Sequence, residues 1–507
     1  MSARILHPLS PALPAALLAS TLISASTFIS GCTVGPNFAP PETKSPETSP
    51  SARWSSLDGN ASTPSTPGTP GNPSKATAGA AEIARWWTSF NDPTLTSLVE
   101  RAIAGNLDMA AAEARIRAAR ARRAIAGGAE LPQVNANGFA GRQPDFKSTS
   151  SPFMDNDSLF AAGFDATWEL DIFGRTRRIV EATDADVAVA EFDLRDVQVT
   201  LAGEVASNYL RLRAAQAQLA IARGDIAAED AALEVIQKLH DSGLAGALDL
   251  ANTRALAEST RARLPVYESE AKDATLALGV LLGGDPSSLA AELTPPAPIP
   301  ALPAQIPVGI PSELLQRRPD IRRAEAELHA ATARIGVAVA DQFPRFSLSA
   351  AIGTRNSDAG EFASFATNYW AAGAGATMPI FDGGRIKANI ELQKSLTDAA
   401  LAQYRQRVLV ALREVEVALT DFANEQQRHA SLARAVDAGK DAVSLASSLY
   451  ASGRTDFLNV VTAERVLLVN QESLTRSERQ IAEHLVSIYK ALGGGWNDTA
   501  SPTAQAN

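Results

Sequence analysis

The chain has 507 residues, of which 45% are hydrophobic and 20% are charged, and its net charge is -10 at pH 7. Nucleic acid is excluded as a partner, because binding it needs a basic surface. No segment after the first thirty residues is long and apolar enough for a transmembrane helix. Membrane-spanning β-strands stay possible, since their signal in a sequence is much weaker.

Residues 1–31 have the pattern of a bacterial lipoprotein signal peptide. Arg4 supplies a positive start, and residues 12–29 are apolar and rich in Ala and Leu. The sequence Ile29-Ser30-Gly31-Cys32 then resembles a lipobox, whose cysteine is lipidated and becomes the first mature residue. We therefore predict lipid on Cys32, the single cysteine of the chain; an ordinary signal peptide beside a stray cysteine is the alternative. Thr33, rather than the Asp of an inner-membrane retention signal, favours the outer membrane.

The segment 32–81 is crowded with Pro, Ser, Thr and Gly. Such a composition cannot bury a core, so we predict a lipidated, flexible N-terminal tether. Residues 495–507 are predicted to form a disordered tail.

The remaining chain repeats itself at a distance of about 210 residues. The clearest match is between 168–175 and 378–385, each of which ends in Gly-Arg and opens a long helical pattern. The repeats are predicted to span 82–284 and 312–494. Residues 285–311 form a connector in which the prolines interrupt helix throughout.

Helices are predicted over 92–130 in the first repeat and 319–342 in the second. Each precedes a pair of segments in which apolar and polar residues alternate. The four alternating segments are 133–142, 160–172, 345–355 and 370–380.

Each alternating segment has about the length of a tilted strand that crosses a bilayer. The connections 143–158 and 356–368 are long and polar. A soluble antiparallel sheet is the alternative, but the lipid signal and the repeat favour a membrane barrel. Lipid tolerates no open sheet edge, and four strands are too few to close a barrel, so the chain is expected to oligomerise.

The alternation also assigns the two faces of the strands. One face is predicted to meet lipid or the barrel rim, and the other the lumen or its mouth. The first carries Phe164, Trp168, Met378 and Ile380, and the second carries Asp165, Thr167, Glu169 and Thr377.

Two long helices are predicted over 175–241 and 385–451, which contain no Pro. Roughly 67 residues at 1.5 Å each give about 100 Å of helix. Apolar residues recur every seven positions, which is the coiled-coil period, so a solvated coiled-coil stalk is one interpretation. Each helix is predicted to end near a glycine, Gly243 or Gly453, and a return helix follows over 248–282 or 456–492.

Several motifs, taken in order, resemble those of the TolC-like outer-membrane factors of the OprM/NodT type. The resemblance covers nearly the whole chain from Cys32 to Trp496. Its carriers are 32–40 (CTVGPNFAP), 86–93 (WWTSFNDP), 131–132 (LP), 171–175 (DIFGR), 315–321 (LQRRPDI), 381–385 (FDGGR) and 450–453 (YASG).

The resemblance implies a mixed α/β membrane protein. Its expected form is a trimeric, twelve-stranded outer-membrane β-barrel, with four strands per chain, continued by a long α-helical periplasmic barrel. An equatorial belt would include the connector 285–311. The implied function is the outer-membrane channel of a tripartite efflux system that exports drugs or other small molecules. A type I protein-secretion channel and a non-channel periplasmic coiled-coil adaptor are the alternatives.

The resemblance also places a periplasmic aperture at the turns that follow the long helices. Relatives often carry Asp where this chain has Asn459 or Thr462, so a tight acidic ring is not expected, although Asp249 adds some negative charge. Gly243 and Gly453 mark the turns where an adaptor would dock. The predicted aperture residues are Leu248, Asp249, Asn252, Leu458, Asn459, Thr462 and Arg465.

No catalytic chemistry is predicted. The five histidines are scattered singly, and no glycine-rich phosphate loop is present. We therefore expect no enzyme activity, no metal and no cofactor apart from the covalent lipid. The expected partners are two further copies of the chain, outer-membrane lipid, a periplasmic adaptor, and an inner-membrane transporter of the RND type.

Overall fold

The computed structural model describes residues 33–41, 54, 74–77, 83–144, 156–309, 311–356 and 368–497. Cys32, the signal peptide, most of the segment 32–81, the tail beyond residue 497, and most of the two predicted loops lie outside these residues. The chain divides into two compact units. The first draws on Met1–Pro40, Arg117–Ala188 and Glu325–Ala402, and the second on Pro41–Ile116, Val189–Ala324 and Gln403–Asn507.

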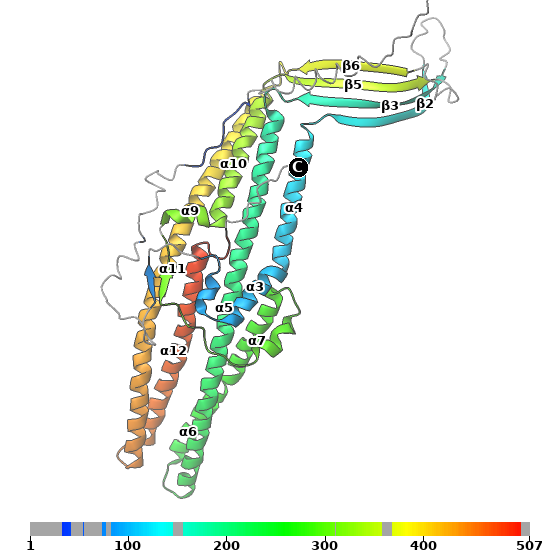
Figure 1. Cartoon of the computed structure of the whole chain (residues 1–507). Helices are drawn as coiled ribbons and strands as arrows, with labels where there is room; N and C mark the ends of the chain where they lie inside the picture. Colours follow the sequence, from blue (N-terminus) through cyan, green and yellow to red (C-terminus); the bar gives the residue numbers. More distant parts are fainter. Residues whose placement is uncertain are drawn as a thin grey trace, which may run out of the picture. The chain divides into compact units, whose positions relative to one another are not determined.

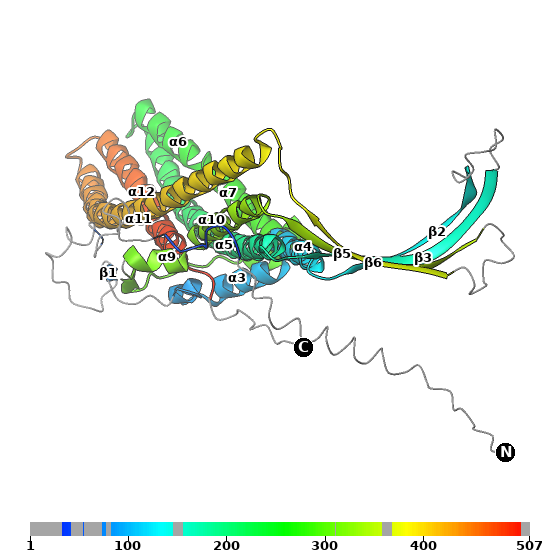
Figure 2. The same cartoon turned by 90° about the horizontal axis from the view of Figure 1, so that it is seen from above.

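The first unit contains one four-stranded antiparallel sheet. Its strands lie side by side in the order β2-β3-β5-β6 (Figures 1 and 2). They span β2 (Gln133–Pro144), β3 (Asn156–Leu170), β5 (Arg345–Asn356) and β6 (Asn368–Thr377). All four predicted strands are confirmed, although their boundaries shift; the largest shifts are that β3 begins inside the predicted loop and that β6 ends three residues before Ile380.

Polar side chains gather on one face of the sheet, as the alternation predicted. Asp165 accepts hydrogen bonds from the side-chain amides of Asn135, at 3.2 Å, and Asn137, at 2.5 Å. Phe164, one position along the same strand, is 59% exposed on the other face. Neighbouring residues of a strand point to opposite faces, so the pleat separates the two kinds of side chain.

Each pair of strands follows a helix and continues into one of two very long helices. These are α5 (Arg175–Asp241) and α11 (Arg385–Ala451), of 67 residues each, and their predicted bounds are confirmed. Gly174 and Gly384, just before the two helices, have positive φ, a conformation that glycine adopts without steric cost. Helix α10 (Pro319–Ala340), which precedes β5, also confirms its prediction.

The helical pattern predicted over 92–130 is confirmed, but it forms more than one helix. Two helices, α3 (Pro93–Gly105) and α4 (Leu107–Gly128), are separated at Asn106. The backbone of Asn106 is extended, and its side-chain oxygen accepts hydrogen bonds from the N–H groups of Asp108 and Met109. Asparagine therefore caps the second helix instead of continuing the first.

The first return helix is also broken, whereas the second is not. The predicted helix 248–282 is split into α6 (Ala247–Arg261) and α7 (Leu264–Leu281), and Pro265 lies in the first turn of α7. Proline lacks the N–H that a continuous helix needs, and it favours the start of a new one. The second return helix, α12 (Phe457–Ala491), is continuous as predicted.

Short elements occupy the rest of the second unit. Strands β1 (Lys75–Thr77) and β4 (Gln305–Pro307) form a parallel pair. The connector is not free of helix, because its first residues form η2 (Pro286–Leu289) and α8 (Ala290–Leu293). The remaining pieces are η1 (Trp86–Phe90), η3 (Pro311–Glu313) and α9 (Leu314–Arg317).

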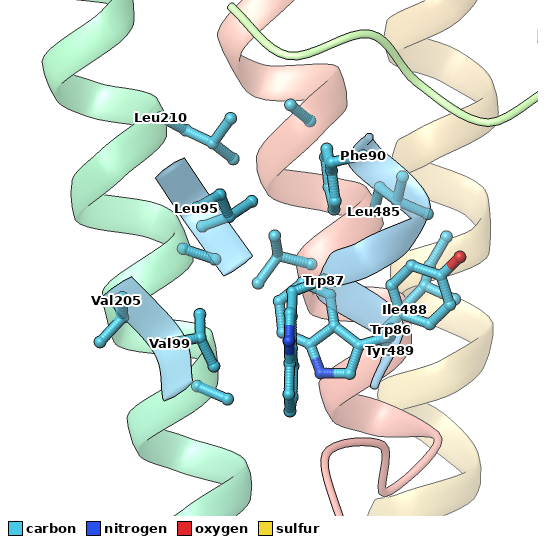
Figure 3. Close-up of a cluster of buried hydrophobic side chains, with 14 of the residues drawn as sticks. Trp86, Trp87, Phe90, Leu95, Val99, Val205, Leu210, Leu485, Ile488 and Tyr489 are labelled. Carbon is cyan, nitrogen blue, oxygen red and sulfur yellow. The ribbon is translucent and has the colours of Figure 1, made fainter. Parts of the chain in front are cut away.

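The main core of the second unit lies where η1 and α3 pack against the long helices (Figure 3). Trp86 stacks on Tyr489 of α12 with ring centroids 5.4 Å apart. Val205 and Leu212, both from the predicted seven-residue stripe of α5, are fully buried here. The stripe therefore packs against several short elements and not only against another long helix.

Within the described residues, no single helix is long and apolar enough to cross a membrane. One bent pair, 247–281 with 286–293, meets the criteria by length and composition only.

Candidate functional site

All the predicted aperture and docking residues belong to the second unit. They lie at the turns that join α5 to α6 and α11 to α12, at the same end of this unit (Figure 1). A small apolar cluster connects the two turns. Ile236 of α5, Leu256 of α6 and Phe457 of α12 are buried in it, and the ring of Tyr450 packs edge-on against Phe457 at 5.0 Å.

The two turns share one hydrogen-bond pattern. The N–H of Gly243 donates to the carbonyl of His240, and the N–H of Leu244 donates to that of Leu239. The second turn repeats both bonds at Gly453 and at Arg454. This is the Schellman motif, which requires a left-handed residue at the glycine position.

The glycines at the two turns meet the conformational requirement of the motif. Gly243 has a φ of 76° and Gly453 a φ of 72°. An added Cβ would meet no atom within 4 Å at either position. Glycine is therefore required here by backbone conformation and not by lack of space.

The starts of the two return helices differ at matched positions. In the first turn, the carboxylate of Asp249 accepts a hydrogen bond from the N–H of Gly246 at 3.3 Å. In the second turn, Asn459 takes the place of Asp249, and its side-chain amide donates to the hydroxyl of Thr455 at 2.6 Å. The half-buried carboxylate of Asp249 thus caps its own helix, and it also faces Tyr450, whose pKa is raised by burial and then by this negative charge.

Most of the predicted aperture residues are exposed in the single chain. Leu248 is 68% exposed and Leu458 is 53% exposed, which is unusual for leucines beside a buried cluster. Thr462 and Arg465 follow Leu458 at helical spacing on the outer face of α12, and Asn459 is exposed beside them; Asn252 of α6 is half-buried. The structure therefore brings the second-repeat residues onto one exposed stripe.

A group of carboxylates further up the same helices was missed by the sequence reasoning. Glu229 of α5 is buried and accepts a hydrogen bond from the hydroxyl of Thr260 at 2.9 Å. Its second carboxylate oxygen is buried without a hydrogen-bond partner among the described residues. Burial, followed by the negative charge of Glu229, raises the pKa of Glu464 on α12.

The pKa of Glu229 itself is raised, chiefly by burial. The positive charge of Arg263, which pairs with Glu472 at 2.6 Å, acts in the opposite direction and lowers the pKa of Glu229. One signal could have revealed the group: Glu229 lies three residues after Ile226 of the apolar stripe, on the face of α5 that turns inward.

Among the described residues, no group of three or more His, Cys, Asp or Glu side chains is placed to hold a metal ion. The arrangement supports instead a pair of rigid turns that present an exposed, partly apolar surface.

Comparison with known proteins gives a consistent result. A family model described as "Outer membrane efflux protein" matches residues 98–284 and 310–494. The chain is 32% identical over 423 residues to the pyoverdine export outer membrane protein OpmQ of Pseudomonas aeruginosa, covering 82% of this chain and 88% of the relative. It is 30% identical over 482 residues to Nodulation protein T of Rhizobium leguminosarum bv. trifolii, covering 94% and 97%.

A solved structure of the outer-membrane channel OprN has a similar fold. The TM-score is 0.83 at 35% sequence identity, and the match covers 92% of this chain and 100% of that one.

Proposed function

Because the chain belongs to the outer membrane efflux protein family, we propose that it forms the outer-membrane channel of a tripartite efflux system that exports small molecules. The observation that carries this function is the extent of the family match. Its first part runs from α3 to the end of the first return helix, and its second part from η3 to the end of the second. It therefore includes every strand of the sheet and both turns of the candidate site.

The channel is proposed to be a homotrimer. Two features support this: the sheet has four strands, and its outer strands β2 and β6 each have one unpaired edge among the described residues. A membrane barrel must be closed, and four strands are too few to close one. Three copies would supply twelve strands, and the helices that follow them would continue as a periplasmic helical barrel.

The two turns are proposed to form the periplasmic aperture. Three copies of each would alternate around a ring, with Leu248 and Leu458 as the apolar groups that restrict passage by dewetting. Asp249 would be a lesser cation-attracting group, since its carboxylate already caps α6. Asn252, Asn459, Thr462 and Arg465 would line the neighbouring surface.

The same turns are proposed to receive a periplasmic adaptor, which would connect the channel to an inner-membrane transporter of the RND type. Gly243 and Gly453 support this role because their turns are exposed and rigidly hydrogen-bonded. A rigid turn loses little conformational entropy when a partner binds it.

The N-terminus is proposed to be anchored in the outer membrane by lipid on Cys32. Residues directly after it are held by the first unit. The N–H of Val34 donates to the carbonyl of Phe173 at 3.1 Å, and the buried Arg178 donates to the carbonyl of Val34 at 3.1 Å. The change Cys32→Ala should abolish labelling by a radioactive fatty acid and the associated cleavage, whereas label retained by this variant would refute the anchor.

The channel itself is tested in detergent-extracted outer membranes and in planar bilayers. We expect a trimer that runs as a larger species before heating on an electrophoresis gel and conducts ions as single channels. Deleting the gene should raise the sensitivity of the cells to at least one exported compound. A protein that is monomeric and non-conducting after extraction would exclude the proposed channel.

A further inference from the structure

Residues 33–38 form a strap over the end of the first repeat, where β3 passes into α5. The buried Arg178 of α5 holds the strap, because its guanidinium donates to the carbonyl of Val34 at 3.1 Å. Further along the strap, the ring of Phe38 stacks on His329 of α10, with ring centroids 4.4 Å apart. The strap therefore lies along the seam between α5 and α10, which we call the first seam.

The strap fits the first seam closely. A Cβ added at Gly174 would come within 2.8 Å of the side chain of Thr33. A Cβ added at Gly35 would lie 2.5 Å from the Cα of Gly336 on α10. Gly336 also leaves space for Arg178, since a Cβ added there would come within 2.8 Å of that side chain. The position of the strap thus depends on small residues and on one arginine.

The internal repeat relates the first seam to a second one. Helices α4 and α10 both have 22 residues and lie 212 positions apart, whereas α5 and α11 lie 210 positions apart. The same shifts convert one observed hydrogen bond into another. The side-chain amide of Asn106 donates to the carbonyl of Leu281 at 2.9 Å, and its counterpart Arg318 donates to that of Ala491 at 2.9 Å. Matched residues therefore occupy equivalent positions in the two repeats.

In the proposed trimer, the second seam lies between α11 of one subunit and α4 of the next. The shifts replace Arg178 by Ala388, and Gly336 by Ala124 of the next subunit. The two changes match each other, because a position that must be glycine beside an arginine can be alanine beside an alanine. The second seam thus keeps small residues at the position of the strap and lacks the arginine that holds a strap there.

The position of the strap is uncovered at the second seam. Gly384 is the counterpart of Gly174, and a Cβ added at Gly384 would meet no atom within 4 Å. The strap of the chain already lies on the first seam, so another molecule must cover this surface.

A basic residue beside the second seam has lost the carboxylate that neutralises its counterpart. Arg175, at the start of α5, pairs with Asp341 at 3.2 Å. The shifts convert Arg175 into Arg385 and Asp341 into Ala129 of the next subunit. Arg385 is exposed, and its side chain has no hydrogen bond or ion pair among the described residues.

A second basic residue has lost its partner in the same way. Arg177 pairs with Asp171 at 3.2 Å. The shift of 210 converts Arg177 into Lys387 and Asp171 into Phe381. Lys387 is also exposed, and its side chain has no polar partner in the part of the chain that the structure describes. Two uncompensated positive charges therefore lie in the first turn of α11.

Apolar side chains border these charges on the side of the sheet. Ile380 is 89% exposed and Phe381 is 92% exposed. The carboxylate of Asp382 accepts hydrogen bonds from the N–H groups of Gly384 and Ile386, at 2.9 Å and 2.7 Å, so these backbone donors are already used. An anion would meet the two cationic side chains instead. Apolar surface followed by positive charge is complementary to an acyl chain followed by a phosphate.

We propose that an anionic phospholipid of the periplasmic leaflet binds at each second seam, three per trimer. The assignment rests on the proposed channel, in which the sheet lies in the outer membrane. The acyl chains lie along Ile380 and Phe381. The headgroup phosphate contacts Arg385 and Lys387, at the place that the strap takes on the first seam.

Native mass spectrometry of the full-length trimer, purified in detergent, tests the site with dioleoylphosphatidylglycerol as the probe. We expect three molecules to bind before any weaker ones, and more tightly than the zwitterionic dioleoylphosphatidylcholine. Changing Arg385→Gln together with Lys387→Gln should lower the affinity for the anionic lipid about fivefold or more. Lys440→Gln is the control, because it removes an exposed charge of α11 that lies in the second unit and pairs with Asp437. It should leave the affinity unchanged.

Two further variants separate charge from space. Lys387→Arg keeps the positive charge and should bind the anionic lipid as the unchanged chain does. Ala388→Trp adds bulk at an exposed position of the second seam without removing a charge, so it should lower the affinity for both lipids. Unchanged binding by Ala388→Trp would mean that the lipid does not occupy the position of the strap.

Three results would contradict the proposal in different ways. An intact trimer that binds dioleoylphosphatidylglycerol equally well with and without Arg385 and Lys387 would overturn the lipid site and leave the channel standing. Inorganic phosphate that competes as well as the lipid does would show an anion site in which the acyl chains have no part, and would overturn it too. A chain that forms no trimer in membranes would instead overturn the proposed function.

Discussion

Leu458 offers a change that alters the proposed aperture with little effect on the fold. It lies at the start of α12, where 53% of it is exposed, whereas the adjacent Phe457 is 7% exposed in the apolar cluster between the turns. Truncating a fully buried leucine costs about 2–5 kcal/mol. Because half of Leu458 is already in water, Leu458→Ala should cost only about 1 kcal/mol. Phe457→Ala, by contrast, should cost about 3–5 kcal/mol and loosen both turns.

The expected functional effect of Leu458→Ala is a larger single-channel conductance in planar bilayers. Three leucines in a ring exclude water from a narrow passage, and alanine removes the branched end of each. Asp249→Ala should raise conductance less, because the carboxylate of Asp249 is half-buried and engaged with the N–H of Gly246. Leu248→Ala, the matched change in the first turn, is expected to act in the same direction as Leu458→Ala.

Two results would contradict this reasoning. If Leu458→Ala leaves the conductance of an intact trimer at the wild-type value, the constriction is formed by other residues. If the variant no longer yields trimers, Leu458 contributes more to stability than its exposed fraction indicates. Phe457→Ala is the control for the second result, because it should lower the yield of folded trimer before any change in conductance can be measured.

Three further outcomes follow from the structure. Phe164→Arg should block insertion into the outer membrane at a cost of about 2–4 kcal/mol near the bilayer midplane, and Thr167→Arg should be tolerated; equal yields of both in membrane fractions would contradict the strand faces. Gly453→Ala should destabilise its turn by about 1–2 kcal/mol because of its positive φ. Gly224→Ala, in a helix where an added Cβ also has open space, should stabilise that helix by about 0.5–1 kcal/mol. Hydrogen exchange of the neighbouring amides measures both effects. Because the pKa of Glu229 is raised in the folded state, the folded state loses stability as pH rises above the range where an ordinary carboxylate titrates. Glu229→Gln should therefore raise the melting temperature at pH 7.5 and not at pH 4. An equal gain at both pH values would exclude charge as the cause.

The sequence predicted the long elements closely because their signals are local. The two long helices begin after a glycine and end near another, and no proline interrupts them, so their bounds could be read to the residue. The breaks at Asn106 and Pro265 were also local signals and were overlooked. A helix-capping asparagine and a first-turn proline both interrupt a pattern whose apolar period continues across them.

The surroundings of the candidate site could not be read in the same way. The seven-residue stripe shows that a helix packs, but it does not show which helix it packs against. That Glu229 meets Thr260, and that its charge affects Glu464, depends on how α5, α6 and α12 come together. Such pairings join residues far apart in the chain, and no spacing within one helix encodes them.

The two halves of the repeat have similar backbones, but their side chains differ at matched positions. The buried carboxylates show how this difference alters the charge between the helices. Shifted by 210 residues, Glu229 corresponds to Gly439, and Glu464 corresponds to Arg254. Within a subunit, the negative charges of Glu229 on α5 and Glu464 on α12 repel each other. The matching positions on α11 and on α6 hold a glycine and an arginine, so the same repulsion does not arise between them. Among the described residues of one chain, the seam of α5 with α12 contains two acids whose pKa values are raised chiefly by burial. Loosening of the helical barrel with rising pH should therefore begin at the seam of α5 with α12, since the matched positions, Gly439 and Arg254, do not bring two acids together.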